Sequence, residues 1–163
     1  MKKVLYPGTF DPITLGHLDL IKRASSIFEE VIVAIAKNSP KNTFFSYQER
    51  LDIVSKVIKP FKNVKLEGFE GLIVEFARKK RIRVLLRGLR MISDFEYEFQ
   101  MALTNRKLAS KIETMFLMPD PRYSYVSAKL IKEAAFLGAD LKEFLPSYSL
   151  KLLRKKVYES SHR

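Results

Sequence analysis

The 163-residue sequence has no cysteine and only two histidines, His17 and His162. Without cysteine the chain forms no disulfide framework and carries no thiolate nucleophile. No apolar run approaches the roughly 20 residues that a membrane span needs, and the N-terminus leads into a strand without a signal-peptide apolar region. We therefore expect a cytoplasmic protein that binds no membrane.

Acidic residues are scarce, because 18 Asp and Glu stand against 30 Lys and Arg, a formal net charge of +12. Such an excess favours anionic partners in general and does not choose among nucleotides, nucleic acid and acidic lipid. Several catalytic patterns are also missing: a Ser-His-Asp set, a Gly-x-Ser-x-Gly elbow, a Walker sequence and zinc-ligand spacing. We therefore expect no covalent nucleophile and no protein-bound metal site.

Five short apolar runs, typical of buried strands, alternate with segments of helical spacing. The predicted strands are residues 4–6, 31–36, 64–66, 84–86 and 115–117. Two capping boxes, Ser46 to Glu49 and Ser93 to Glu96, predict helix starts, and the second helix should run to about residue 108. Further helices are expected from 16–17, after Gly71, through 131–135 and within 141–158. This alternation predicts one α/β domain over 1–163, a parallel five-stranded sheet with helices on both faces and C-terminal helices, with 159–163 frayed.

The most informative stretch is the Gly/Pro-rich turn between the first strand and the first helix. It reads Pro7-Gly8-Thr9-Phe10-Asp11-Pro12, followed by Thr14-Leu15-Gly16-His17. A helix N-terminus offers unpaired N–H groups to phosphate, Gly16 allows close approach, and His17 adds a side-chain donor. The turn therefore indicates a nucleotide site, although a tight turn without function has the same composition.

A second candidate site follows the fourth strand, where Arg87 and Arg90 flank Gly88. Arginine grips phosphate through two parallel N–H groups, and ligands of parallel sheets bind beyond the carboxyl ends of the strands. The alternative is an ion pair with Asp94 or Glu98, and both interpretations can hold together.

The first motif resembles the signature of the nucleotidyltransferase superfamily. The segment Arg87-Gly88-Leu89-Arg90, with Asp94-Phe95-Glu96-Tyr97-Glu98, resembles a single branch, the bacterial phosphopantetheine adenylyltransferases. The resemblance runs from Val4 to about Pro146. It implies a Rossmann-like fold and transfer of AMP from ATP to 4′-phosphopantetheine, giving dephospho-coenzyme A and pyrophosphate by direct in-line attack. It also implies Mg²⁺ on the triphosphate and a homohexamer.

The resemblance assigns roles to individual residues. It implies that His17 stabilises the transition state. Acceptor contacts fall to Thr9, Lys41, Ile73 and Arg87. ATP contacts fall to Thr9, Phe10, His17, Gly88, Leu89, Arg90, Glu98, Tyr123, Ser124, Tyr125, Val126, Ser127, Ala128 and Lys129.

The second nucleotide motif departs from the family pattern, which is usually Ile-Ser-Ser-Thr or Ile-Ser-Ser-Ser. Val126 and Ser127 fit, whereas Ala128 and Lys129 stand where hydroxyl residues are usual. We expect backbone N–H groups to keep the phosphate contact and Lys129 to approach the triphosphate. A solvated lysine at a helix start is the alternative.

Two rival functions deserve comparison. Another nucleotidyltransferase with the same first motif would act on a mononucleotide, but the segment from Arg87 to Glu98 speaks against it. An RNA-binding module would account for the net charge, but the sequence lacks the interleaved aromatic and basic residues of stacking surfaces. We therefore expect no nucleic-acid partner.

Overall fold

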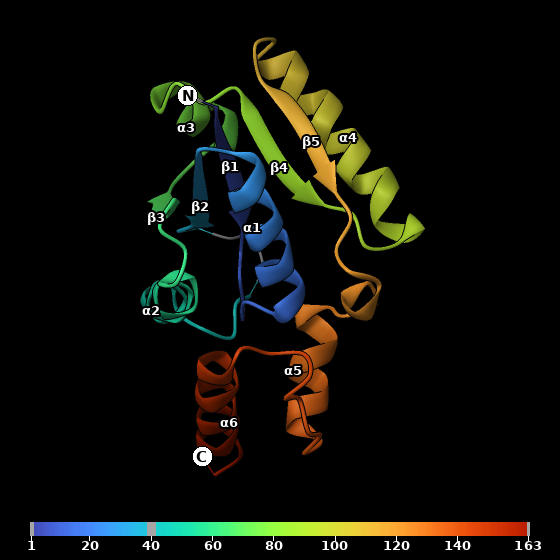
Figure 1. Cartoon of the computed structure of the whole chain (residues 1–163). Coiled ribbons are helices and arrows are strands. Elements are labelled where there is room, and N and C mark those ends of the chain that lie inside the picture. The colour runs from blue at the N-terminus through green and yellow to red at the C-terminus, as the bar shows by residue number, and fades with distance from the viewer. Residues whose placement is uncertain (1, 39–41, 163) are drawn as a thin grey trace.

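The computed structural model describes residues 2–38 and 42–162, and within them five parallel strands form one sheet. The strands are β1 (Lys3–Gly8), β2 (Glu30–Ala36), β3 (Val64–Phe69), β4 (Val84–Gly88) and β5 (Glu113–Leu117). The helices are α1 (Leu15–Ile27), α2 (Tyr47–Ile58), α3 (Ile73–Lys79), α4 (Ile92–Leu108), α5 (Ala128–Phe136) and α6 (Ser147–Ser161), with a 3-10 turn at Pro121–Tyr123. The predicted α/β fold is confirmed (Figure 1).

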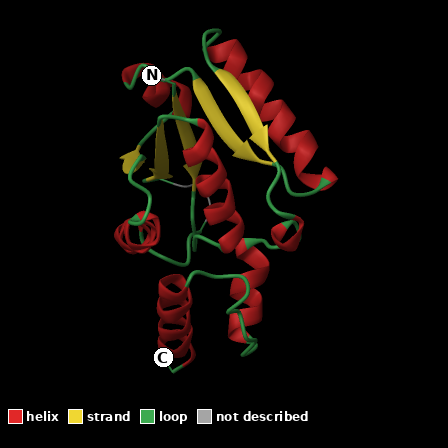
Figure 2. Cartoon of the chain, in the orientation of Figure 1, coloured by secondary structure: helices red, strands yellow, loops and turns green. Residues whose placement is uncertain are grey.

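The strand order is β3-β2-β1-β4-β5, so β1 lies between β2 and β4 at the centre of the sheet. Alternate strand residues face opposite helix layers. Val4 packs with α1, α2, α5 and α6 in one core cluster, whereas Leu5 packs with α3 and the ends of α4 and β5 in the other. Helices therefore cover both faces, and α5 and α6 lie beyond the carboxyl ends of the strands (Figure 2).

The helix α4 is unusual because Glu98 is its single buried residue. Apolar side chains are exposed all around it, led by Ile92 at 91% and Tyr97 at 61%. Among the described residues, no helix is long and apolar enough to cross a bilayer.

The two predicted capping boxes had opposite outcomes. Ser46 caps α2, since its Oγ accepts from the Glu49 N–H at 3.2 Å and the Glu49 carboxylate accepts from the Ser46 N–H at 2.6 Å. The prediction at Ser93 was wrong, because α4 begins at Ile92 and its N-cap, Met91, makes no side-chain capping bond. The Met91 carbonyl already accepts from the Asp94 N–H at 3.0 Å, which places Ser93 inside the first turn. At the other end of the chain, α6 continues to Ser161 rather than ending at 158.

This contrast provides a matched pair of variants. Ser46→Ala removes one partner of a reciprocal cap and should lower the free energy of unfolding by about 1 kcal/mol. Ser93→Ala, at an exposed position without a capping bond, should change it by less than about 0.5 kcal/mol. Urea unfolding of both variants measures the difference, and equal losses would contradict the assignment of the caps.

Candidate nucleotide site at the carboxyl edge of the sheet

The two candidate motifs meet at the centre of the sheet. The first follows β1 and the second follows β4, and these strands are neighbours that pair at Leu5 and Leu85. From β1 the chain continues to β2 on one side, and from β4 it continues to β5 on the other. Such a reversal is where open α/β sheets form ligand crevices.

His17 takes part in a reciprocal cap at the start of α1. This helix begins at Leu15, one residue before the predicted start, and Thr14 is its N-cap. The Thr14 Oγ1 accepts from the His17 N–H at 3.3 Å, and His17 Nδ1 accepts from the Thr14 N–H at 3.0 Å. Because Nδ1 accepts a hydrogen bond from a backbone amide, the ring proton of the neutral imidazole belongs on Nε2.

The surroundings of His17 keep its imidazole uncharged. Burial, followed by the positive charges of Arg90 and Arg87, lowers the pKa of His17 to about 4. The buried ring of Phe10 packs obliquely against it, with ring centroids 5.2 Å apart. At neutral pH His17 is therefore a fixed neutral donor through Nε2–H, suited to bond a phosphate oxygen and unsuited to remove a proton.

Two glycines make room for this arrangement. A Cβ on Gly8 would lie 2.7 Å from the ring of Phe10, so the ring occupies the space above that glycine. A Cβ on Gly16 would lie 3.3 Å from the Cβ of Tyr123. The loop that carries the second nucleotide motif therefore packs directly on the first turn of α1.

Arg87 is held side-on by Glu98 of α4. Its Nε and Nη2 donate to the two carboxylate oxygens at 2.7 and 2.5 Å, and its Nη1 donates to the Pro7 carbonyl at 2.9 Å. Burial works against its charge, but the bonds to Glu98 outweigh this, so the pKa of Arg87 lies above its usual value. A guanidinium has five N–H donors, and these contacts leave N–H groups for an anion.

Arg90 joins two of the predicted ATP-binding segments. Its Nη1 donates to the carbonyl of Val126 at 2.8 Å, which ties the loop after β4 to the loop before α5. Its Nε and Nη2 donate to the carboxylate of Asp94 at 3.0 and 3.1 Å. The ion pairs proposed as the alternative role of both arginines are thus present. They orient the guanidinium groups and leave each of them N–H groups that form none of these bonds.

The second motif forms the N-terminus of α5. Ser127 is the N-cap, and its Oγ accepts from the Leu130 N–H at 3.2 Å. Ala128 and Lys129 fill the first turn, and the Lys129 side chain is 85% exposed, 4.0 Å from the Glu133 carboxylate. Upstream, Ser124 Oγ donates to the Pro121 carbonyl and Tyr125 is exposed. The approach of Lys129 to a triphosphate stays a prediction.

The predicted acceptor contacts other than Arg87 come from separate segments of the chain. Thr9 directly follows β1 and is partly buried. Ile73 begins α3 and packs against the core cluster on that face of the sheet. Lys41 lies outside the described residues.

Sequence reasoning assigned no role to three charged residues at the first motif, namely Asp11 within it, Arg50 of α2 and Lys132 of α5. Asp11 is 6% exposed and bonds Lys132 Nζ at 2.6 Å, while Arg50 is 1% exposed. Local pattern gives no signal for a buried arginine, since its carbonyl partners come from distant segments. The cap between Thr14 and His17 did have a signal, the spacing of a capping box with histidine in place of glutamate.

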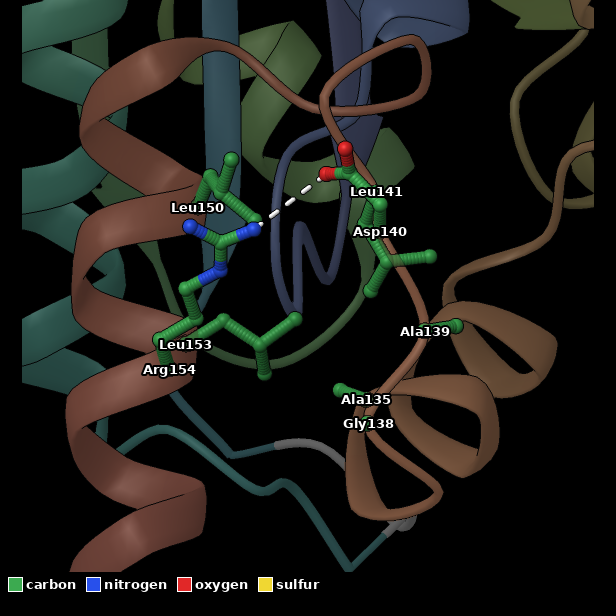
Figure 3. Close-up of a pocket in the computed structure, with 8 residues that line it drawn as sticks. All are labelled: Ala135, Gly138, Ala139, Asp140, Leu141, Leu150, Leu153 and Arg154. Carbon is green, nitrogen blue, oxygen red and sulfur yellow. Dashed lines mark hydrogen bonds and ion pairs between the residues drawn. The ribbon is translucent and has the colours of Figure 1, made fainter.

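A separate cavity of about 400 Å³ lies between α5 and α6 (Figure 3). Small and apolar side chains line it, and an ion pair of 3.2 Å between Arg154 and Asp140 crosses its rim. None of the described residues predicted to bind ATP or the acceptor lines it. It is lined by Ala135, Gly138, Ala139, Asp140, Leu141, Leu150, Leu153 and Arg154.

Comparison with known proteins shows the family of the chain. Residues 5–134 match a family described as cytidylyltransferase-like. A phosphopantetheine adenylyltransferase of Hahella chejuensis is 51% identical over 96% of this chain and 97% of its own length. The protein of that name from Alkaliphilus metalliredigens is 48% identical over 96% and 99%. The chain belongs to the phosphopantetheine adenylyltransferase family.

More distant proteins share the fold of this member of the phosphopantetheine adenylyltransferase family. A crystal structure described as a candidate nicotinate-nucleotide adenylyltransferase from Vibrio parahaemolyticus superposes with a TM-score of 0.71. The alignment covers 97% of this chain and 96% of that one at 21% identity, so it shows a shared fold alone.

The low pKa of His17 predicts a pH-dependent stability. The unfolded chain has a histidine pKa near 6.5, so between about pH 4 and 6.5 it binds more protons than the folded state. The free energy of unfolding should therefore fall as the pH drops through that window, by about 2 kcal/mol between pH 7.5 and 5 from this residue. Urea unfolding at both values measures the loss.

His17→Asn should flatten that pH dependence, whereas His162→Asn, at an exposed position near the C-terminus, should leave it unchanged. Equal pH dependence in all three proteins would contradict a neutral, partly buried His17.

Proposed function

We propose that this protein transfers AMP from ATP to 4′-phosphopantetheine, forming dephospho-coenzyme A and pyrophosphate. The names of relatives that are 47–51% identical over nearly the whole chain support this. Two features of the site carry the proposal. The first is the neutral Nε2–H donor of His17 beside Gly16, and the second is the pair of arginines at the carboxyl ends of the neighbouring parallel strands β1 and β4.

The reaction is a direct in-line displacement. A phosphate oxygen of the acceptor forms a bond to the α-phosphorus of ATP, and the bond from that phosphorus to the β-phosphate bridging oxygen breaks. The attacking phosphate is already an anion, so no residue has to remove a proton. The protein supplies position and charge stabilisation, and His17 donates Nε2–H to the α-phosphate as its equatorial oxygens gain charge.

The two substrates divide the site between them. Arg87 turns its remaining N–H groups toward the acceptor phosphate, with Lys41, Ile73 and Thr9 along the rest of that molecule. ATP lies on Gly88 to Arg90 and residues 123–129, against the N-termini of α1 and α5. Because Glu98 holds Arg87 by two bonds, it connects the ATP segment with the acceptor segment.

Magnesium enters this reaction as part of the Mg–ATP substrate. Among residues 2–38 and 42–162, no group of three or more His, Cys, Asp and Glu side chains could hold a metal ion. The nearby carboxylates of Asp94 and Glu98 are bonded to arginines. The ion would therefore take its ligands from the phosphates and water, as is usual for Mg²⁺ at nucleotides.

The exposed apolar side chains of α4 suggest that copies of this chain assemble through it. Large contiguous apolar patches on soluble proteins mark interfaces. The protein would then act in the cytoplasm as a homohexamer, which is the oligomeric state that the family resemblance implies. Sedimentation velocity measures that state. The exposed residues are Ile92, Phe95, Tyr97, Phe99, Met101, Leu103 and Leu108.

A pyrophosphate-release assay tests the reaction. The purified protein should release pyrophosphate only when ATP, Mg²⁺ and 4′-phosphopantetheine are all present. Nicotinamide mononucleotide is the matched alternative acceptor, and equal turnover with it would assign the protein to a mononucleotide branch. An RNA titration completes the comparison, since steeply salt-dependent RNA binding without any preference for ATP would indicate the nucleic-acid rival.

The role of His17 predicts a specific kinetic pattern. Because its donor acts most strongly on charge that develops in the transition state, His17→Ala should lower kcat by about 10²–10³-fold and leave ATP binding close to normal. Stopped assays for kcat and calorimetry for ATP separate the two, with His162→Ala as control. Near-normal kcat with a large rise in the Michaelis constant for ATP would show that His17 only anchors the nucleotide, provided that circular dichroism shows a folded variant.

A further inference from the structure

The turn that presents Thr9 and packs on His17 has an unfavourable backbone. Phe10 has a φ of 50°, in the left-handed region, although it carries a large side chain that is 2% exposed. Such a conformation costs about 1–3 kcal/mol and persists only where the surroundings impose it. The contacts on each side of Phe10 therefore decide whether its ring stays against His17.

On the C-terminal side, Asp11 supplies one such contact. Its carboxylate accepts from the backbone N–H groups of Phe44 and Phe45, both at 2.8 Å, and from Lys132 of α5 at 2.6 Å. These bonds connect the turn to the segment that precedes α2 and to α5.

On the N-terminal side, the contact comes from Arg50 of α2. Its Nη1 donates to the Thr9 carbonyl at 2.8 Å, and Nη1 and Nη2 both donate to the Ala36 carbonyl at 3.1 Å. Gly8 and Ile35 form the last pair between β1 and β2, so Thr9 and Ala36 follow that pair directly. The guanidinium thus bridges the two strands where their own ladder of hydrogen bonds ends.

The free-energy cost of burying the Arg50 guanidinium at this position is high for a purely structural contact. The side chain is 1% exposed, its Nε has no acceptor among the described residues, and no described carboxylate forms an ion pair with it. Burying a charge without a paired partner is expensive, and an uncharged side chain would fill the same space more cheaply. Asp11 provides the nearby negative charge that offsets part of this cost.

We propose that Arg50 is a positioning residue, which fixes the Thr9 and Ala36 carbonyls so that the Phe10 turn holds His17 and Thr9 in their reactive places. It contacts neither substrate. Its action reaches the chemistry through Thr9 and through the ring of Phe10. The proposal rests on the proposed function for its kinetic consequence, and on geometry alone for its effect on His17.

Arg50→Lys and Arg50→Gln are the test variants. Lysine keeps the charge but replaces the planar guanidinium with a single nitrogen and so loses the second bond to the Ala36 carbonyl, and glutamine removes the charge while keeping two N–H donors. Arg78→Lys and Arg78→Gln are matched controls, because Arg78 also donates to a backbone carbonyl, that of Leu108 at 3.0 Å, from the exposed end of α3. Circular dichroism and thermal unfolding establish which variants fold.

The first measurement is an NMR titration of the His17 ring in the substrate-free protein, with the signal assigned by comparison with His162→Asn. We expect the pKa of His17 to rise from about 4 toward 6.5 in both Arg50 variants, as the ring loses its packing, and to stay unchanged in both Arg78 variants. A rise in Arg50→Gln alone would show a charge effect and would overturn the positioning role.

The second measurement is pyrophosphate release. A displacement of about 1 Å at a reacting group costs on the order of 10²-fold, so kcat of Arg50→Lys should fall by about that factor, with calorimetric ATP affinity within about threefold of the parent. A folded Arg50→Lys with parental kcat and an unshifted His17 would overturn the proposal. If neither variant folds, Arg50 is a determinant of the whole fold and the proposal is wrong.

Failure of the proposed function has a different signature. The parent protein would then release no pyrophosphate from ATP and 4′-phosphopantetheine, whereas the His17 titration would still report whether Arg50 holds the turn.

Discussion

The parallel ladder that holds β1 between β2 and β4 is the constraint on which the site depends. β1 is central, and it pairs with β2 from Lys3 to Gly8 and with β4 at Leu5. Where this pairing ends along either edge, the carbonyls of the chain need other donors. The guanidinium of Arg50 meets that need for Thr9, and the guanidinium of Arg87 does so for Pro7. Charged side chains thus finish the sheet where the substrates would bind.

The sequence predicted the fold well because the relevant signals are local and strong. Continuous apolar runs located all five strands, and their alternation with helical spacing implied parallel pairing and two helix layers. The predicted start of α4 was wrong although Ser93 and Glu96 match a capping pattern. The Met91 carbonyl accepts a hydrogen bond from the Asp94 N–H, so the helix begins before Ser93. A local pattern shows which residues can cap a helix, but the contacts of the preceding loop decide where the helix begins.

The candidate site was predictable in its motifs and unpredictable in its connections. Gly16, His17, Arg87 and Arg90 stand out from the sequence by residue type and position. The sequence offered Asp94 and Glu98 as ion-pair partners without showing which arginine each one binds, and Val126 contributes only a backbone carbonyl. The neutral state of the His17 imidazole likewise follows from its surroundings in three dimensions and from two arginines that the fold brings near it. The sequence therefore names the groups, and tertiary packing sets their protonation and aim.

The exposure of α4 bears on how the protein avoids aggregation. Within residues 2–38 and 42–162 the sheet ends at β5, whose outer edge pairs with no further strand, and an open edge is a template for pairing with unfolded chains. The helix that follows β4 lies beside this strand (Figure 1) but brings its own apolar surface to the solvent. A partner copy packed on α4 would cover both the open edge of β5 and the apolar surface of α4. In such an assembly, newly made chains would be most vulnerable before they associate, and the rate of association would set how much folded protein survives synthesis.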